Sequence, residues 1–338
     1  MRNTCRKFRW HLSVTMLMVS LTVVWYCYDD LATGGFHHKQ RQKLDWQAEI
    51  INPHPYRFTV AHQEKCEHGG SDVFVVIIVH TAHGHVTHRQ AIRATWGNQS
   101  NIPGVEIRTL FALGTTDNQD LQRAIEKEDA MHEDIIQENF KDSYKNLTLK
   151  TVMTLKWFLY FCPKAGYLMK TDDDTYVNVL NLVKTLRMLK DKTGLVTGFV
   201  LKGSQPRRDV MSKWYVSVED FPKETFPWYT AGGTGYVMSS DVVPLLYQMS
   251  LRTKPLPLED VYIGMCLETL GITPKQNKQF HCCDKLTYDP CVYKNLITSH
   301  GITVSEMYAI WEGEQDLKKK CGFYHDWIVP ALNSLLYA

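Results

Sequence analysis

The chain has 338 residues, a formal net charge of +2, 44% hydrophobic residues and nine tryptophans. Because the charge is nearly balanced, no global field recruits nucleic acid, and we expect no nucleic-acid partner. The hydrophobic content is sufficient for one large core or two smaller ones.

The N-terminal segment differs in kind from the rest of the chain. Residues 10–28 are almost entirely apolar, follow four basic residues and precede Asp29 and Asp30. As a helix this segment would span about 28 Å, enough to cross a bilayer with the N-terminus in the cytosol. A cleaved signal peptide is the alternative, but aromatic residues stand where a small-residue cleavage site would be. We predict a cytoplasmic tail at 1–9 and a transmembrane signal anchor at 10–28, as in a type II membrane protein.

The segment 29–68 is polar and contains two prolines, which is typical of a stem, so we place a lumenal domain at 69–338. Two sequons predict N-glycosylation at Asn98 and Asn146. An oxidising lumen would pair most of the seven cysteines beyond the anchor and leave at least one unpaired. These are Cys66, Cys162, Cys266, Cys282, Cys283, Cys291 and Cys321. No two Cys-x-x-Cys pairs are present, so we expect no structural zinc site.

The predicted elements after the stem alternate between strands and helices. The first, at 72–80, is a continuous β-branched run that indicates a strand buried on both faces. A helix at 89–96, a strand at 107–113, a helix at 118–131 and a short strand at 134–137 follow. The helix predicted at 147–161 ends before Pro163 and leads into a strand that reaches residue 172. Beyond it we expect a helix at 179–189, strands at 195–201 and 214–216, and helices that begin near residues 240 and 258. This order favours an α/β domain with a parallel-type sheet covered on both sides.

Three consecutive acids, Asp172, Asp173 and Asp174, end the apolar strand that begins near residue 167. Ligands of open α/β sheets bind at the carboxyl edge of the strands, where such acids would lie. Clustered carboxylates repel one another unless a cation compensates them. An acidic cap of the helix near residue 179 is the ordinary alternative, and this run alone leaves both open.

Four further groups of residues could carry chemistry, and each has an ordinary structural alternative. Glu259 and Asp260 follow two prolines and open a helix, where acids also serve as caps. The stretch 228–239 combines glycines with aromatic residues, which suits a sugar or an ordinary turn. Arg89 and Arg93 share one helical face, and His300 ends an apolar run where it could complete a set of oxygen ligands.

Together these motifs resemble the β-1,3-glycosyltransferase family over about residues 66–321. The resemblance depends on five segments in the same order: RQAIRATWG at 89–97, KTDDD at 170–174, SKWY at 212–215, GTGY at 233–236 and EDVYIG at 259–264. It is strongest for the β-1,3-galactosyltransferases, although TAG at 230–232 departs from their pattern towards that of the β-1,3-N-acetylglucosaminyltransferases.

The resemblance implies a GT-A fold, a UDP-sugar donor and inversion at the anomeric carbon. It assigns Asp172, Asp174 and His300 to Mn²⁺, and Asp260 to the general base with Glu259 beside it on the acceptor side. The implied donor-binding residues are Arg89, Arg93, Trp96, Lys170, Asp172 and Asp173. The acceptor-binding residues implied in the same way are Trp214, Gly233 and Tyr236.

With the predicted anchor, the resemblance implies a Golgi membrane enzyme that transfers galactose from UDP-galactose to a terminal N-acetylhexosamine of a glycoprotein or glycolipid. A β-1,3-N-acetylglucosaminyltransferase that acts on galactose is the alternative within the family. An inactive lumenal glycan-binding protein is the alternative from another class. The oligomeric state stays open, with a homodimer as one candidate.

Overall fold

The structure is a computed structural model that describes residues 49–98, 102–315 and 321. The predicted tail, the predicted anchor at 10–28 and most of the predicted stem lie outside these residues. Within the part that is described, no helix combines the length and the apolar character needed to cross a membrane.

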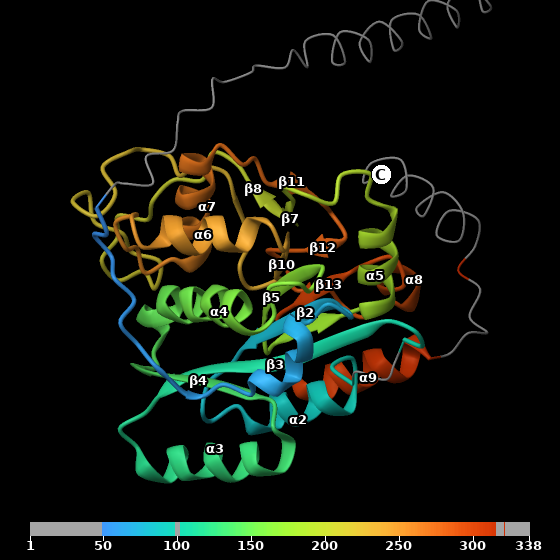
Figure 1. Cartoon of the computed structure of the whole chain (residues 1–338). Coiled ribbons are helices and arrows are strands. Elements are labelled where there is room, and N and C mark those ends of the chain that lie inside the picture. Colours follow the sequence, from blue (N-terminus) through green and yellow to red (C-terminus); the bar gives the residue numbers. More distant parts are fainter. Residues whose placement is uncertain (1–48, 99–101, 316–320, 322–338) are drawn as a thin grey trace, which may run out of the picture. The chain divides into compact units, whose positions relative to one another are not determined.

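A mixed sheet forms the centre of the fold (Figure 1). Its strands follow one another in space as β1 (Phe58–Val60), β4 (Ile135–Lys141), β3 (Glu106–Thr115), β2 (Val73–His80), β5 (Tyr167–Asp172), β10 (Tyr236–Ser239), β7 (Val196–Gly198) and β11 (Lys275–Gln276). Strands β4, β3, β2 and β5 are parallel neighbours, which confirms the predicted parallel centre. Strand β10 runs antiparallel between β5 and β7, and β1 runs antiparallel at the edge beside β4, so the whole sheet is mixed.

Two small sheets extend the carboxyl side of the central sheet. One contains β12 (Phe280–His281), β13 (Thr298–His300) and β6 (Thr175–Val177), and the other pairs β8 (Val200–Leu201) with β9 (Tyr229–Thr230). The predicted strand at 214–216 is wrong, because only an isolated bridge between Arg207 and Tyr215 forms there.

Helices cover both faces of the central sheet (Figure 1). Helices α4 (Leu147–Phe161), α6 (Val242–Ser250) and α7 (Glu259–Leu270) pack against one another on one face. Helices on the other face contribute to the hydrophobic core, namely α2 (Val86–Ala94), α3 (Gln119–His132), α5 (Val179–Met188) and α9 (Val304–Glu314). Short helical segments occur at η1 (Gln63–Gly69), η3 (Tyr144–Asn146) and α8 (Pro290–Tyr293).

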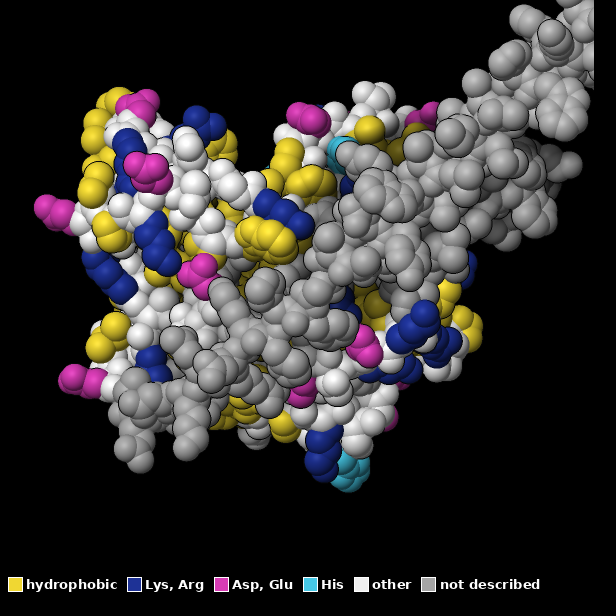
Figure 2. Space-filling view, turned by 90° about the horizontal axis from the view of Figure 1, so that it is seen from above, with side chains coloured by type: hydrophobic (Ala, Val, Ile, Leu, Met, Phe, Trp, Pro, Cys, Tyr) yellow, Lys and Arg dark blue, Asp and Glu magenta, His cyan; other side chains and the backbone are white. Residues whose placement is uncertain are grey.

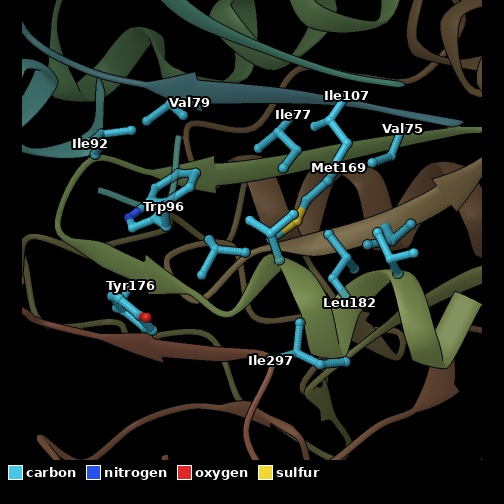
Figure 3. Packing of buried hydrophobic residues seen from close by; sticks show 14 of the residues in the cluster. Val75, Ile77, Val79, Ile92, Trp96, Ile107, Met169, Tyr176, Leu182 and Ile297 are labelled. Atoms are coloured by element: carbon cyan, nitrogen blue, oxygen red, sulfur yellow. The ribbon is translucent and has the colours of Figure 1, made fainter. Parts of the chain in front are cut away.

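The core follows the alternation of side chains along the strands (Figure 3). Val75, Ile77 and Val79 of β2 point to the same side as Met169 of β5 and pack there against Leu182 of α5. The intervening residues of β2 are also fully buried, since α4 covers the opposite face. This burial on both faces confirms the prediction from the continuous apolar run.

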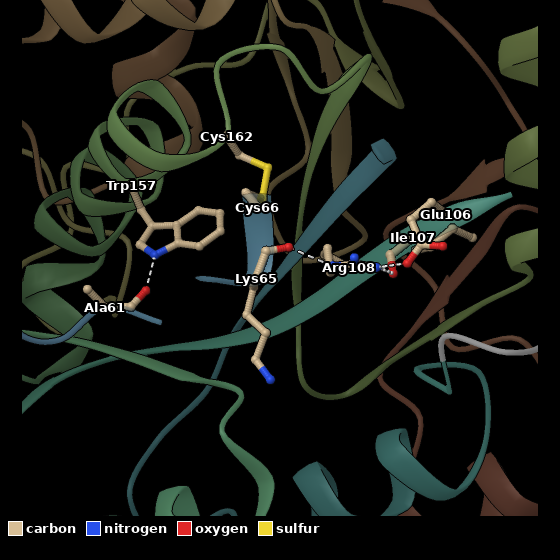
Figure 4. The surroundings of a disulfide bond; sticks show 8 residues. All are labelled: Ala61, Lys65, Cys66, Glu106, Ile107, Arg108, Trp157 and Cys162. Carbon is tan, nitrogen blue, oxygen red and sulfur yellow. Dashed lines mark hydrogen bonds and ion pairs between the residues drawn. A yellow bond between two sulfur atoms is a disulfide. The ribbon is translucent and has the colours of Figure 1, made fainter. Parts of the chain in front are cut away.

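The folded part begins earlier than the predicted boundary at residue 69. Strand β1 lies within the predicted stem yet pairs with β4, and the buried Glu138 of β4 binds both His54 and Lys156. The indole nitrogen of Trp157 in α4 donates to the carbonyl of Ala61, as Figure 4 shows. A three-residue strand in a polar segment gives too weak a pattern to be read from sequence.

Three disulfides join six of the seven cysteines beyond the predicted anchor. They connect Cys66 with Cys162 (Figure 4), Cys282 with Cys283, and Cys291 with Cys321. Cys266 is buried in α7 and free, which confirms the prediction of one unpaired cysteine. Burial raises the pKa of this thiol to about 12.

Candidate active site

The acidic triplet lies at the carboxyl edge of the sheet, as predicted. Strand β5 ends at Asp172, and β6 begins at Thr175, so Asp173 and Asp174 form the turn between the two strands. Strand β13 pairs with β6 so that His300 lies opposite Thr175. Antiparallel pairing therefore brings His300 from the C-terminal part of the chain to the acids, where its Nε2 is 3.3 Å from Oδ1 of Asp174.

Asp172, Asp174 and His300 form a group that could hold a metal ion. One ligand atom from each residue lies within 4.8 Å of those from the other two. Two carboxylates suit hard divalent cations such as Mn²⁺, and an imidazole completes a set of oxygen and nitrogen ligands. The side chains present thus fit the predicted Mn²⁺.

Charges within this group shift the pKa values of its members. Burial raises the pKa of Asp172 to about 6 against the opposing effect of Lys170, and Glu259 and Asp174 raise it further. Burial also disfavours the charged form of Asp174, but the hydrogen bond and charge of His300 outweigh it and lower the pKa of Asp174. The same hydrogen bond raises the pKa of His300 against the effect of burial. A divalent cation would relieve the repulsion among these carboxylates.

A glycine turn separates the metal-binding group from Asp260. A Cβ on Gly233 would lie 2.7 Å from Nε2 of His300, and a Cβ on Gly232 would collide with Oε1 of Glu259. The backbone N–H of Gly232 donates to Oδ2 of Asp260 at 3.3 Å. Glycines at these two positions therefore let the turn fit between the predicted metal ligands and the predicted base.

Asp260 and Glu259 point in different directions from the first turn of α7. Oδ1 of Asp260 accepts from the backbone N–H of Val261 at 2.8 Å. Burial and the neighbouring Glu259 raise the pKa of Asp260 to about 6. Glu259 instead points into the fold, where Lys170, Thr151 and Tyr236 bind its carboxylate. This position differs from the acceptor-side position predicted for Glu259, because a helix rotates adjacent side chains by about 100°.

The predicted donor-binding residues occupy three different environments. Arg89 is fully buried, and its guanidinium binds Glu128 of α3 and carbonyls of the loop after β2. Arg93 pairs with Glu128 and Asp134, and Trp96 lies in the core. Arg89 thus connects α2 and α3 to the loop after β2, and direct donor contacts by these three residues stay a prediction.

Asp173 holds the same loop from the other side. Its Oδ2 accepts from Oγ1 of Thr81 at 2.5 Å and lies 2.8 Å from Nδ1 of His85. Asp173 is buried, and its carboxylate points to the loop and away from the metal-binding group.

The predicted acceptor-binding residues also occupy different environments. Tyr236 is fully buried with its hydroxyl on Glu259, so it is not open to an acceptor, while Gly233 is half-buried and its carbonyl accepts from Thr175. Trp214 is 48% exposed and lies beside Tyr144, which is 52% exposed. Burial raises the pKa of Tyr144, Trp214 opposes this shift, and the charges of Asp260, Asp172 and Glu259 add to it.

Tyr144 is a candidate that the sequence analysis missed. Its hydroxyl is close enough to the acids to respond to their charges, although 28 or more positions separate it from each of them along the chain. Seen from above, hydrophobic and basic side chains lie next to one another on the surface (Figure 2). Tyr144 and Trp214 are half-exposed, and aromatic rings of this kind can stack on sugar rings.

The structure describes Asn98 and Asn146, the two predicted glycosylation sites, although residues 99 and 100 of the first sequon lie outside the described residues. Asn98 is exposed, and the amide of Asn146 donates to the carbonyl of Lys141 at 2.8 Å. Their modification stays a prediction.

Comparison with known proteins assigns the family. The family model described as Galactosyltransferase matches residues 87–278. The β-1,3-galactosyltransferase 1 of Mus musculus and that of Homo sapiens are each 45% identical over 263 residues, which cover 77% of this chain and 79% of each relative. The chain belongs to the β-1,3-glycosyltransferase family. The matched residues contain Arg89, the acidic triplet, the glycine turn and Asp260, while His300 lies beyond them.

Further members of the family differ in the sugar that their names carry. The UDP-GalNAc:beta-1,3-N-acetylgalactosaminyltransferase 1 of Mus musculus is 34% identical over 321 residues, covering 92% of this chain and 94% of the relative. A solved glycosyltransferase, involved in glycosylation of the major capsid of PBCV-1, matches 70% of this chain and 98% of its own, with 12% identity and a TM-score of 0.39. The β-1,3-glycosyltransferase family thus includes relatives with different donors.

Proposed function

We propose that the protein is an inverting β-1,3-galactosyltransferase that uses Mn²⁺ and transfers galactose from UDP-galactose to the 3-hydroxyl of a terminal N-acetylhexosamine. One observation supports this most strongly: two consecutive glycines separate the base from the metal-binding group. The N–H of Gly232 donates to Asp260, and Gly233 faces His300 at a place where a Cβ would lie 2.7 Å from Nε2. An inverting transfer needs the base and the leaving-group site at separate positions, because the departing diphosphate and the attacking hydroxyl lie on opposite sides of the anomeric carbon.

Asp260 is the proposed general base. Its pKa of about 6 leaves the carboxylate mostly ionised at neutral pH and still able to take the proton of a sugar hydroxyl. The two backbone N–H groups that bind it fix its orientation towards the acceptor. A single displacement forms no covalent intermediate, so one positioned carboxylate suffices on this side.

Asp172, Asp174 and His300 are the proposed ligands of Mn²⁺. The bound cation would act as a Lewis acid that stabilises the negative charge of the UDP leaving group. Asp174 is kept ionised by His300, and Asp172 is held by Lys170. These residues would therefore hold the diphosphate end of the donor.

Galactose is the proposed donor sugar because the 45% identical relatives are named galactosyltransferases. N-acetylgalactosamine is a second candidate, supported by the name of the 34% identical relative. N-acetylglucosamine stays a third, since residues 230–232 resemble that branch. A glycan-binding protein without activity would have no use for a base beside a complete set of metal ligands.

We further propose that residues 10–28 anchor the protein in the Golgi membrane with its catalytic domain in the lumen. The apolar segment with its basic flank and the three disulfides support this location, since disulfides persist in the secretory pathway. The acceptor would then be a glycan on a glycoprotein or glycolipid in the same compartment.

A panel of donors and acceptors tests the proposal. A secreted fragment of residues 49–338 is incubated with UDP-galactose, UDP-GalNAc or UDP-GlcNAc and with acceptors that end in GlcNAc, GalNAc or galactose, with and without Mn²⁺. We expect transfer from UDP-galactose to an N-acetylhexosamine in the presence of Mn²⁺. Preference for another donor would reassign the specificity, and glycan binding without any transfer or UDP-sugar hydrolysis would favour the inactive binder.

A further inference from the structure

A buried lysine lies between the metal-binding group and the base. Lys170 of β5 is 2% exposed, and its Nζ donates to Oδ1 of Asp172 at 2.7 Å and to Oε1 of Glu259 at 2.8 Å. Its third contact is the carbonyl of Gly232 at 3.2 Å. An ammonium group has three donors, and here each has an acceptor.

From this geometry we infer that Lys170 and Glu259 are positioning residues, which fix the metal ligand Asp172 relative to the base Asp260. The inference rests on the proposed function, since it concerns the same two carboxylates. It gives Glu259 a role inside the fold in place of a role on the acceptor side.

Strand geometry places three members of this network on one face. Residues 170 and 172 are two apart in β5, so their side chains point to the same side of the sheet. Tyr236 lies directly opposite Lys170 in β10 and is therefore its cross-strand neighbour on that face. Glu259, the first residue of α7, reaches this face, where its carboxylate binds Lys170 and Tyr236.

Both carboxylate oxygens of Glu259 are bound within the fold. Oε1 binds Lys170, while Oε2 accepts from Oγ1 of Thr151 at 3.0 Å and from the hydroxyl of Tyr236 at 3.2 Å. The side chain is 5% exposed, and Gly232 packs so closely against it that a Cβ there would collide with Oε1. These contacts lock the first turn of α7, from which Asp260 projects.

Charge explains why a lysine occupies this position. Four carboxylates gather here, from Asp172, Asp174, Glu259 and Asp260, and Lys170 is the cation that bonds to two of them. An uncompensated Glu259 would repel both Asp260 beside it in the helix and Asp172 across the turn. Lys170 offsets Glu259 and at the same time orients the carboxylate of Asp172.

A purely structural ion pair and a positioning pair predict different results for a double substitution. Replacing a buried ion pair by apolar residues of similar size is often neutral for stability, whereas removing one partner is strongly destabilising. If the pair serves stability alone, Lys170→Met combined with Glu259→Leu should recover both stability and function. If the pair positions the metal ligand and the base, the double variant should recover stability without recovering function.

The experiment compares Lys170→Met, Glu259→Leu and the double variant of the 49–338 fragment. Thermal unfolding reports stability, isothermal titration reports the affinity for UDP in the presence of Mn²⁺, and steady-state kinetics give kcat and KM. We expect the double variant to unfold near the wild-type temperature, with UDP affinity at least about tenfold weaker and kcat at least about tenfold lower. Lys170→Arg should retain more of both than Lys170→Met.

Lys156→Met is the matched control, because it breaks another buried pair, with Glu138, near the opposite edge of the sheet. It should lower the unfolding temperature without changing Mn²⁺-dependent UDP binding. Recovery of UDP affinity and kcat in the double variant would overturn the inference, as would wild-type values in Glu259→Leu. If the wild type binds UDP with Mn²⁺ but transfers no galactose, the proposed function fails, while the binding result still decides the inference.

Discussion

Substitution of Asp260 by asparagine removes the proposed base while keeping the size of the side chain and one of its two backbone contacts. The side chain accepts from the N–H groups of Gly232 and Val261, and the amide oxygen of asparagine can replace one of these acceptors. A positioned general base contributes about 10²- to 10⁴-fold to a rate. We therefore expect kcat to fall by about that factor in Asp260→Asn.

The pH dependence of kcat/KM in the wild type gives a second quantitative prediction for Asp260. With a pKa of about 6, Asp260 is about nine-tenths ionised at pH 7 and about one-tenth ionised at pH 5. Since the base acts in its ionised form, kcat/KM should rise with pH through about 6 and should be about tenfold lower at pH 5 than at pH 7. Asp172, also with a pKa of about 6, acts in the same direction because a metal ligand must be deprotonated, so tenfold is the lower limit of the fall.

Two assays separate a base from a metal ligand. Transfer from UDP-galactose gives kcat and KM, and isothermal titration gives the affinity for UDP with Mn²⁺. We expect Asp260→Asn to bind UDP nearly as the wild type does. Asp120→Asn makes the same chemical change at an exposed residue of α3 and should leave both quantities unchanged. Lost UDP affinity in Asp260→Asn would refute the reasoning and place Asp260 in the metal site.

Three further changes test other parts of the structure. Gly233→Ala would place a Cβ 2.7 Å from Nε2 of His300 and should weaken Mn²⁺-dependent UDP binding at least about tenfold by titration, whereas Gly84→Ala, with open space around it, should not. A fragment that begins at residue 62 lacks β1 and His54. In urea, its free energy of unfolding should be about 3–5 kcal/mol lower than that of the 49–338 fragment, and equal values would exclude residues 49–61 from the fold. In the native 49–338 fragment at pH 8, Cys266 should resist alkylation. After denaturation, mass spectrometry should detect one alkylated thiol, whereas rapid labelling of the native fragment would contradict the burial of Cys266.

The sequence predicted the elements whose patterns are long and regular. The helix predicted at 147–161 matches the observed bounds Leu147–Phe161, and the buried strand at 72–80 is β2. The position of the acids at the carboxyl edge also followed, because it depends only on the end of one apolar strand. Strand β1 was missed, since its three residues pair with a distant strand and carry no pattern of their own.

The candidate site was predictable in its members but not in their orientations. Adjacent residues at 259 and 260 look equivalent in sequence, and only the packing of α7 against β5 and β10 turns one carboxylate inward and the other outward. Tyr236 was assigned to the acceptor from its place in a motif, yet the alternation of β10 buries it beside Lys170. Tyr144 was missed because its proximity to the acids comes from the fold and from no local pattern.

The central claim is that Asp172, Asp174 and His300 hold a Mn²⁺ that is needed for the transfer of galactose to a 3-hydroxyl. The most direct measurement follows galactose transfer from UDP-galactose to a GlcNAc-terminated acceptor by the 49–338 fragment after exhaustive chelation and after Mn²⁺ is added back. We predict that chelation abolishes transfer, that Mn²⁺ restores it, and that NMR of the product shows a β-1,3 linkage. Transfer that persists in the chelated protein, or an α-linked product, would contradict the account.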